Sequence, residues 1–562
     1  MKAFALFSLN LLFFLIFNLA SCKAKKDFSG FQRSERKEVD IFMIPEKFNI
    51  MESEWVETST ISSFAKSDLI RHLKSYGRTL NDLQNNPDTM YSENDGIVKM
   101  KVKKTSHSTG FYYDVKIPIV FYGPKWFKQG EYHKEIHQQH IVPTLAKILN
   151  IRNPNGVVTH PLLEIYKDQN NPEKPEIIVT VVIDQGGQQL YRSHPDVSEN
   201  ISKIKKESAY FPNAEVGHLD AHTAVGHAAI GTGAYPSKNL VIGNTYYYYN
   251  DRKVTYKDIY SQGNQTNVDL SELAVESLSD VLDSENGNKS EIISQCYALR
   301  ASIGMAGHGA FKLDNMSYQG DKDIVYWHDK YNNVWTTDNR YFEAPSFATE
   351  YDTIANFIKT YPHGWKNHHG DTVTENKKNW AILLGSPAEA RMEGEMFRRT
   401  LEEYIIKKGK HNDGYTDLAY VTLKATDSTG HHFGWESLES RETFTETDKQ
   451  VGLIFEMLKK NYGDKFIMII TADHGCAPLP EISGGKRLTI DKFFEEIHSL
   501  LPEGNTDSLI NYATIGQISL NKEMLKKHNI SEEEVRNKIK MISVDGKPFF
   551  KEVILKSELN TK

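Results

Sequence analysis

Acidic residues follow three apolar runs of this sequence, at the point where each run ends. Asp184 follows "IIVTVVI", Asp427 follows "LAYVTLKAT", and Asp473, with His474 beside it, follows "FIMIITA". A single aspartate at such a point is equally well explained as a helix cap. Residues just beyond the carboxyl ends of parallel strands, however, converge on one crevice. We therefore expect these side chains to lie close together.

Histidines stand next to two of these acids. His431 comes four residues after Asp427, in "TDSTGHHFG", and a turn of that length lets a carboxylate and an imidazole reach one ion. Asp473 and His474 offer a second pair of oxygen and nitrogen ligands. Mixed Asp and His ligation suits Zn²⁺, with Mn²⁺ or Fe as alternatives. Two such groups predict a site for two divalent metal ions.

A candidate nucleophile lies in "AHTAVGHAAIGTGAYP", residues 221–236, which places Thr223 at a predicted junction between a loop and a helix. Unpaired backbone N–H groups and the helix dipole favour an arriving phosphate there. Taken alone, Thr223 is best interpreted as an N-cap. The glycines do not form a P-loop, since no Gly-Lys-Ser/Thr follows them. Beside the metal-binding acids, Thr223 becomes a candidate for covalent catalysis.

The elements that must position these residues alternate along the chain. The clearest predicted strands are residues 117–123, 176–184, 418–427 and 465–475, and the clearest helices are residues 138–151 and 446–463. Short apolar runs alternating with amphipathic stretches predict an α/β fold, a mostly parallel sheet sandwiched by helices. Between about residues 245 and 415 the pattern weakens, which favours a cap insertion over further sheet.

The motifs together resemble a known family. "VVIDQ", "HTAVGHAAIGTGAYPSKNLVIGN", "TDLAYVTLKATDSTGHHFGWES" and "TADHG" are similar to the alkaline phosphatase superfamily, in particular its type I phosphodiesterase/nucleotide pyrophosphatase and threonine-nucleophile phosphatase branch. The match runs, with gaps, from about residue 176 to 480. It implies a small-molecule phosphoester substrate, namely a phosphomonoester, a phosphodiester or a nucleotide pyrophosphate. It also implies a phospho-threonine intermediate at a two-metal site.

The resemblance assigns roles to single residues. Thr223 is similar to the nucleophile, and Asn244 is similar to the asparagine that hydrogen-bonds a phosphate oxygen, aided by the backbone N–H that follows Thr223. It also implies two sets of metal ligands: Asp184, Asp473 and His474 for one ion, and Asp427, His431 and one further histidine for the other.

The further histidine is predicted at the wrong end of the chain. In the family it comes last, but nothing downstream of Asp473 fits. "SHSTGFYYDVKIPIVFYGP", which contains His107, has the family's order of His, small residues, Tyr-Asp, Pro, apolar run and Gly-Pro. "HIVPTLAKILNI" then resembles the family's next helix, although His140 stands where the family has Asp. The sequence is therefore predicted to be circularly permuted, with "KDQNNPEKPE" joining the old end to the old start.

One position departs from the family. "CYALRASIGMAGH", residues 296–308, resembles the part of the phosphomonoesterase branch that clamps phosphate with a Lys-x-Arg pair. Arg300 matches the arginine, but Ala298 occupies the lysine position. Arginine can still contact phosphate oxygens bidentately. Because a monoester dianion carries more charge than a diester, the missing lysine weakens a strict monoesterase interpretation and leaves diesters, pyrophosphates or an unusual monoester open.

The amino terminus predicts export. Residues 1–21 have one lysine, an apolar segment and a small-residue end, which is typical of a secretory signal peptide. The ending "LASC" resembles a bacterial lipobox and implies lipidation of Cys22, followed by a charged tether at residues 22–40. We expect a lipid-anchored protein of the bacterial cell envelope, periplasmic or on the outer membrane. The membrane is thus a predicted partner.

The rest of the chain, residues 41–562, is predicted to be one alkaline-phosphatase-like domain. Residues 41–166 would hold the permuted C-terminal part of the fold and residues 177–562 the remainder, with the cap at about 245–415. The net charge of −7 and pI near 6.3 give no electrostatic reason to expect a nucleic-acid partner. Whether Cys296 and Cys476 pair is left open. The alternative function is a non-catalytic binding lipoprotein on the same scaffold, against which the full ligand set argues.

Overall fold

The computed structural model describes most of the chain from residue 39 onward. The described residues are 39–52, 59–86, 89–250, 253–314, 316, 318–329, 332, 334–350, 365–366, 372–373, 385–410 and 413–560. The predicted signal peptide, Cys22 and nearly all of the tether lie outside them. No helix in the described ranges is long and apolar enough to cross a membrane.

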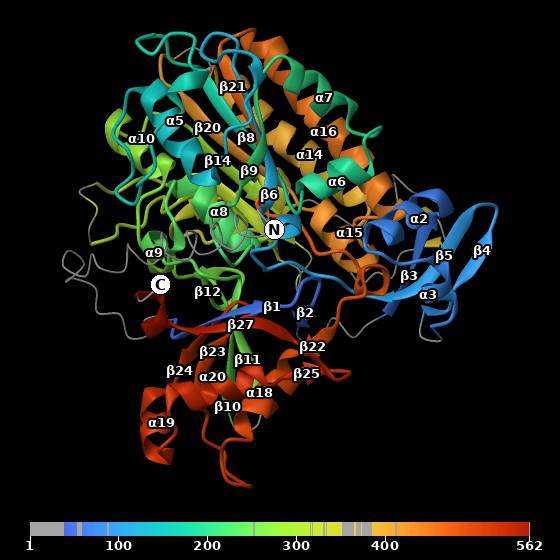
Figure 1. The fold of residues 1–562 in the computed structure, drawn as a ribbon. Helices are drawn as coiled ribbons and strands as arrows, with labels where there is room; N and C mark the ends of the chain where they lie inside the picture. The colour runs from blue at the N-terminus through green and yellow to red at the C-terminus, as the bar shows by residue number, and fades with distance from the viewer. Residues whose placement is uncertain are drawn as a thin grey trace.

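A large sheet forms the centre of the molecule, in the strand order β16-β15-β14-β20-β8-β21-β6-β9-β7, with β17 paired to β15 (Figure 1). Neighbours from β15 to β21 pair in parallel, whereas β6 runs antiparallel to β21 and β9. The mostly parallel α/β sheet is thus confirmed. Its strands are β16 (Val334–Thr336), β15 (Asp323–Asp329), β14 (Ile292–Cys296), β20 (Asp417–Leu423), β8 (Ile177–Ile183), β21 (Phe466–Thr471), β6 (Lys116–Tyr122), β9 (Ala209–Glu215), β7 (Gly130–Glu131) and β17 (Phe342–Glu343).

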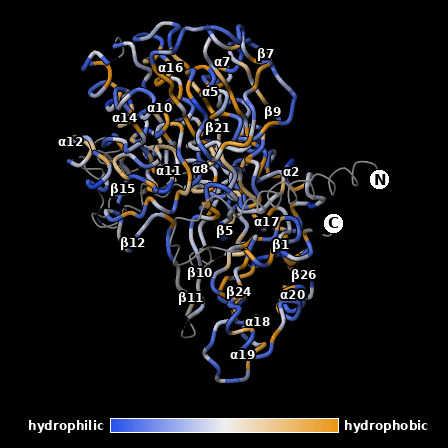
Figure 2. The backbone as a smooth tube through the Cα atoms, turned by 90° about the vertical axis from the view of Figure 1, so that its left-hand side faces the viewer, coloured by the Kyte–Doolittle hydropathy of each residue, from blue (hydrophilic) through white to orange (hydrophobic). Residues whose placement is uncertain are grey.

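Helices cover both faces of this sheet, which is why β8, β20 and β21 are buried along their whole length. Two apolar clusters join the strands to these helices, and Figure 2 shows hydrophobic segments running through this part of the molecule. One face packs against α5 (Ile141–Leu149), α8 (Thr223–Thr232), α10 (Leu278–Asn286) and α11 (Leu299–Ala306), and the other against α6 (Gln188–Ser193), α7 (Glu199–Lys206), α14 (Pro387–Leu401) and α16 (Leu438–Tyr462).

A second sheet lies below the first in Figure 1 and combines distant parts of the chain, in the order β11-β10-β23-β24-β1-β27. It has its own apolar core. The tyrosine run "TYYYYN" is its strand β10, where Tyr246 is fully buried. Its elements are β11 (Lys253–Asp258), β10 (Thr245–Asn250), β23 (Ile510–Ala513), β24 (Gln517–Leu520), β1 (Ile41–Pro45) and β27 (Phe550–Leu555), with α18 (Ile490–His498), α19 (Lys522–His528) and α20 (Glu532–Lys540).

A small third unit lies to the right in Figure 1, where β5 (Ile97–Lys103) pairs with β3 (Ser59–Ala65) and β4 (Ser92–Asn94) beside α2 (Lys66–Ser75) and α3 (Leu80–Gln84). Shorter elements connect the units: β2 (Ile50–Glu52), α4 (Tyr112–Val115), α9 (Pro236–Asn239), β12 (Ser261–Asn264), β13 (Asn267–Val268), α12 (Ser346–Thr349), β18 (Trp365–Lys366), β19 (Thr372–Val373), α15 (Ala425–Phe433), α17 (Pro480–Ser483), β22 (Arg487–Thr489), β25 (Ser543–Val544) and β26 (Lys547–Pro548).

The expected cap at about residues 245–415 is not a single insertion. β14 and β15 fall inside this range and pair in parallel within the large sheet, and α14 packs on its helical layer beside α16. β14 is hard to predict from the sequence because it is only five residues long and because two of its buried residues, Ser294 and Gln295, are polar. Among the described residues of this range, β10 and β11 belong to the second sheet, and β12–β13 and β18–β19 form separate two-stranded sheets.

Candidate active site at the carboxyl edge of the large sheet

The three predicted acids meet where the central parallel strands end. Asp184 follows β8 directly, Asp473 lies two residues after β21, and Asp427 lies in the first turn of α15, which follows β20. β20 and β21 are the two neighbours of β8, so strand order alone brings the acids together. All three side chains are buried, with at most 3% of any residue exposed.

One group of candidate ligands forms around Asp427. His431 stands four residues later on the same helix, and its Nε2 lies 3.2 Å from Asp427 Oδ1. His107 comes from the loop before α4, and its Nε2 lies 3.6 Å from the same oxygen. The strand that follows this loop, β6, pairs with β21. The structure therefore places His107 beside the two residues with which it was expected to act.

A second group forms around Asp184. His474 Nε2 lies 3.5 Å from Asp184 Oδ1 and 3.2 Å from Asp473 Oδ2. The rings of His474 and His107 stack, with centroids 3.7 Å apart and an interplanar angle of 26°. The two groups are thus adjacent, as a two-metal site requires.

The three histidines are oriented by the same kind of hydrogen bond. In each, Nδ1–H donates to a backbone carbonyl at 2.6–2.8 Å, which turns Nε2 towards the acids. The acceptors are Ala221 for His107, Thr105 for His431 and Gly475 for His474.

Three carboxylate oxygens at the site are buried without a hydrogen-bond donor: Asp184 Oδ1, Asp184 Oδ2, which forms an ion pair with Lys424, and Asp473 Oδ2. Burial raises the pKa of Asp184 to about 6, against the opposing charges of Lys424 and Arg300. Burial and the charge of Asp184 raise the pKa of Asp473 well above its usual value. Buried carboxylates without a partner are costly unless a cation compensates them. The donor set of carboxylates and bare imidazole nitrogens therefore fits two divalent ions.

Thr223 is the first residue of α8, and only 1% of its surface is exposed. The N-cap of this helix is His222, so the Thr223 hydroxyl does not serve as a cap. Instead Oγ1 lies 3.4 Å from His474 Nε2. Because the helix N-terminus faces the same space, an anion brought to Thr223 would also meet the positive end of the helix dipole.

Asn244 lies next to Thr223, but it uses the backbone donor that was expected to bind phosphate. The N–H of Ala224 donates to Asn244 Oδ1 at 2.7 Å. Because the oxygen of this amide accepts that bond, its NH₂ group is left as the donor available to a ligand. This bond orients Asn244, and the contact from Ala224 to phosphate stays a prediction.

Arg300 lies in the first turn of α11, which packs against α8. Its Nε is buried and has no acceptor within the described residues. Ala298 is the N-cap of the same helix, so the position where the resembling family carries lysine has no charge. The arginine is thus available to an anion, and this helix lacks the second cation that the family carries, as the sequence indicates.

Lys424 was missed in the sequence, although it stands only three residues before Asp427. Its Nζ lies 2.9 Å from Asp184 Oδ2, 2.5 Å from Asp427 Oδ2 and 3.5 Å from Thr223 Oγ1. Burial lowers the pKa of Lys424, but the charges of Asp184 and Asp427 outweigh burial and raise it. The signal was a lysine directly after a wholly buried strand, where a solvated side chain was the easier interpretation.

Gln185 was also missed. It adopts a left-handed conformation with φ of 62°, and from there its backbone N–H donates to Asp473 Oδ1 and its side-chain amide donates to Asp427 Oδ1. A Cβ at Gly430 would lie 1.8 Å from Gln185 Oε1. A side chain at this position of "TGHHFG" would therefore displace the Gln185 amide from Asp427.

His227 is close to the acids but serves the scaffold. Its Nδ1 lies 3.4 Å from Asp473 Oδ2, within the range of a shared ion. Both ring nitrogens are nevertheless engaged, Nδ1 with the carbonyl of Thr223 at 2.7 Å and Nε2 with the hydroxyl of Thr422 at 2.8 Å. The ring of His227 therefore holds the start of α8 against the end of β20.

A model of the family described as type I phosphodiesterase / nucleotide pyrophosphatase matches residues 178–561. The chain belongs to this family. Members of this family and its relatives in the alkaline phosphatase superfamily are phosphoester hydrolases, and the chain is one of them. The family match starts at β8 and leaves residues 1–177, with His107, outside it.

Curated relatives of this phosphodiesterase-family chain are distant. It is 24% identical over 429 residues to a calcium-transporting ATPase of Myroides odoratus, which covers 67% of the chain and 75% of the relative. It is 26% identical over 358 residues to alkaline phosphatase PhoV of Synechococcus elongatus, covering 56% of the chain and 62% of that protein. It is 23% identical over 412 residues to alkaline phosphatase PafA of Elizabethkingia meningoseptica, which covers 66% of this chain and 73% of PafA.

Among solved structures, that of wild-type alkaline phosphatase PafA superimposes with a TM-score of 0.50 at 17% identity. The superposition covers 70% of this chain and 78% of PafA. This likeness confirms the alkaline-phosphatase-like fold of the phosphodiesterase-family chain.

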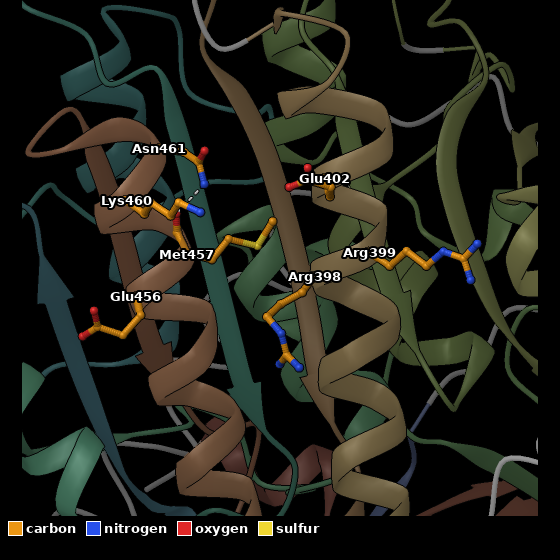
Figure 3. A pocket seen from close by; sticks show the side chains of 7 residues that line it. All are labelled: Arg398, Arg399, Glu402, Glu456, Met457, Lys460 and Asn461. Atoms are coloured by element: carbon orange, nitrogen blue, oxygen red, sulfur yellow. Dashed lines mark hydrogen bonds between the residues drawn. The ribbon is translucent and has the colours of Figure 1, made fainter. Parts of the chain in front are cut away.

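The chain also has a surface hollow of about 500 Å³ between α14 and α16 (Figure 3). No candidate ligand, nor Thr223, Asn244 or Arg300, lines it, and its mixed charges offer no nucleophile. It is therefore not the phosphoester site. Its lining consists of Arg398, Arg399, Glu402, Glu456, Met457, Lys460 and Asn461.

Cys296 and Cys476, whose pairing the sequence left open, are both buried and are not joined by a disulfide.

Proposed function

We propose that the protein is a two-metal phosphoester hydrolase that acts through a phospho-threonine intermediate on Thr223. The observation that carries this proposal is the position of the Thr223 hydroxyl at the N-terminus of α8, within 3.4 Å of His474 Nε2 and beside two groups of buried acids and histidines. A nucleophile, a place for cations and an anion-attracting helix end therefore coincide.

The proposed ions are Zn²⁺, with Mn²⁺ or Fe as alternatives. When bound, they would act as Lewis acids that favour the ionised hydroxyl and neutralise charge on the phosphoryl group. The residues proposed to hold them are Asp184, Asp473 and His474 for one ion, and Asp427, His431 and His107 for the other.

Thr223 would do the covalent chemistry. Its Oγ forms a bond to phosphorus while the bond from phosphorus to the leaving oxygen breaks. Water then forms a bond to phosphorus, and the bond from phosphorus to Oγ breaks. The hydroxyl proton is lost in the first step and regained from water in the second. The NH₂ of Asn244 and the guanidinium of Arg300 would hold non-bridging oxygens as their charge grows.

The proposed substrates are phosphomonoesters, phosphodiesters or nucleotide pyrophosphates. The family description names the last two classes, and several relatives are named alkaline phosphatases. Another is named ectonucleotide pyrophosphatase/phosphodiesterase family member 7 of Mus musculus, 26% identical over 170 residues.

The test is hydrolysis of p-nitrophenyl phosphate and bis-p-nitrophenyl phosphate by purified protein whose metal content has been measured. Thr223→Ala should lower turnover of both esters by at least about 10³-fold, because it removes the nucleophile. Thr232→Ala, at the other end of α8, is the matched control and should keep turnover. A metal-free protein that turns over neither ester would support the alternative, a non-catalytic binding protein.

We also propose that the protein is exported and anchored by a lipid on Cys22 in the bacterial cell envelope. The support is the apolar segment and "LASC" ending in residues 1–22. In a bacterial host the wild type should partition with membranes, and Cys22→Ala should be recovered in the soluble fraction. Equal partitioning of the two would contradict the anchor.

A further inference from the structure

The ammonium group of Lys424 lies inside the candidate site rather than at its rim. Lys424 is 5% exposed. Its Nζ contacts Asp184 Oδ2 at 2.9 Å and Asp427 Oδ2 at 2.5 Å. A fixed positive charge thus joins one acid from each group of candidate ligands.

Lys424 does not contact the other oxygen of either acid, although Asp427 Oδ1 accepts a hydrogen bond from the Gln185 amide at 3.0 Å. Asp184 Oδ1 points to His474, at 3.5 Å from its Nε2. Asp427 Oδ1 points to His431 and His107, at 3.2 and 3.6 Å from their Nε2 atoms. Because the lysine binds only the Oδ2 atoms, its position is compatible with metal binding on the opposite side of each carboxylate.

The same ammonium faces the nucleophile. Lys424 Nζ lies 3.5 Å from Thr223 Oγ1. A phosphorus atom attacked by this oxygen must therefore come within a few ångströms of the lysine charge. Arg300 is the other cation of this region, and its influence on the pKa of Asp184 adds to that of Lys424. Lys424 and Arg300 together are one lysine and one arginine, the two residue types that clamp phosphate in the resembling branch. The lysine does not come from the helix that carries Arg300, which has alanine at position 298.

We propose that Lys424 replaces the missing lysine and makes this site selective for phosphomonoesters. The inference rests on the proposed function and names its substrate class. A monoester dianion carries one more negative charge on its non-bridging oxygens than a diester does. A fixed cation beside the attacked phosphorus, in a site shielded from water, therefore stabilises the monoester's transition state more than the diester's.

The competing explanation is that Lys424 only neutralises the buried acids. In that case its removal would disturb ion binding and would affect all substrates alike. The two explanations differ in three measurable quantities: the metal content of the protein, the ratio of monoester to diester turnover, and the inhibition by inorganic phosphate, which is itself a product with a high negative charge.

The experiment compares Lys424→Met, which removes the charge at similar length, and Lys424→Gln, which keeps a hydrogen-bond donor without charge. The matched control is Lys205→Met, which removes a half-buried ammonium that lies over Tyr191 and Tyr210 at 4.5 and 4.8 Å from their ring centroids. Melting curves and metal analysis establish that each variant is folded and loaded. Then kcat/KM is measured for p-nitrophenyl phosphate and bis-p-nitrophenyl phosphate, together with the inhibition constant of inorganic phosphate.

Both Lys424 variants should keep their metal content and lose about 10²–10³-fold in kcat/KM for the monoester, the usual effect of removing one transition-state donor. The loss for the diester should be less than about tenfold, and the phosphate inhibition constant should rise by at least about tenfold. Lys205→Met should change none of these. An equal loss on both esters, an unchanged phosphate inhibition constant, or a fall in metal content in both variants would overturn the inference. If the wild type hydrolyses neither ester, the proposed function is wrong, and the inference falls with it.

Discussion

Two groups of acids occupy opposite edges of the same sheet. Asp184, Asp427 and Asp473 are buried and lie at the carboxyl ends of parallel strands. Asp283, Asp321 and Asp323 form a second group, with one oxygen of each within 4.8 Å of the others; Asp321 is exposed, and Asp323 begins β15. This second group lies at the amino edge of the sheet. The two edges are about 20 Å apart, because each residue of a seven-residue strand adds about 3.3 Å.

The difference lies in the cations that surround each group. At the carboxyl edge, burial raises the pKa of Asp427. The positive charges of His431 and Lys424 outweigh burial and hold this pKa well below its usual value. At the amino edge, burial and the neighbouring acids raise the pKa of Asp283 to about 8. Asp427 of the first group is therefore held charged by nearby cations, although burial raises the pKa of its neighbours Asp184 and Asp473. Asp283 of the second group has no such cations among the described residues and tends to stay protonated. Proximity of carboxylates alone does not make a catalytic site.

The comparison predicts its largest effect from a matched pair of substitutions. Asp184→Asn should lower turnover of both nitrophenyl esters by about 10³-fold and reduce the bound metal, because a charged ligand of one ion is lost. Asp323→Asn should leave turnover within about threefold, as expected for a residue remote from the chemistry. Steady-state kinetics and metal analysis of both variants test this. Equal losses would mean that the two edges are functionally coupled.

His107 offers a smaller but sharper test of the carboxyl edge. His107→Ala should lower the metal content from about two ions to about one per chain, because the ion at Asp427 and His431 loses its third ligand. His140→Ala, a half-buried histidine in the same part of the chain, is the control and should keep both ions. If metal content survived the loss of His107, its proposed role and the permuted order of the motifs would both fail.

The amino edge predicts the smallest effect, on stability. Because the pKa of Asp283 is about 8 in the folded protein and about 3.9 when unfolded, unfolding releases a proton between these values. The contribution of Asp283 to the free energy of unfolding is therefore fully present below about pH 4, and it is lost as the pH rises towards 8. Asp283→Asn stays neutral, so its melting temperature should fall less between pH 5 and 8.5, by about a few degrees.

The control is to repeat the melting curves of the wild type and of Asp283→Asn with added calcium. If added calcium raised the melting temperature of the wild type but not of Asp283→Asn, the amino-edge acids would bind an ion. The proposed difference between the two edges would then be wrong.

Sequence reasoning found the carboxyl edge because its acids follow long apolar strands whose ends must converge. His107 could be found only through the resemblance, since nothing local in "SHSTG" marks a ligand. Lys424 could not be found, because its role depends on which oxygens of two distant acids it contacts. The expected cap failed for a similar reason: β14 buries polar side chains whose partners, such as Glu393 for Gln295, come from a distant helix.

The second sheet has a consequence for how the chain reaches its native state. Strand β1 pairs with β27, with Ile41 opposite Leu555, so nearly the whole chain must be synthesised before these strands can meet. Such contacts carry a large loop-closure entropy and form late. We expect the second sheet to close last, after the large sheet, so that shortened chains would leave the apolar side of β1 exposed and prone to aggregation.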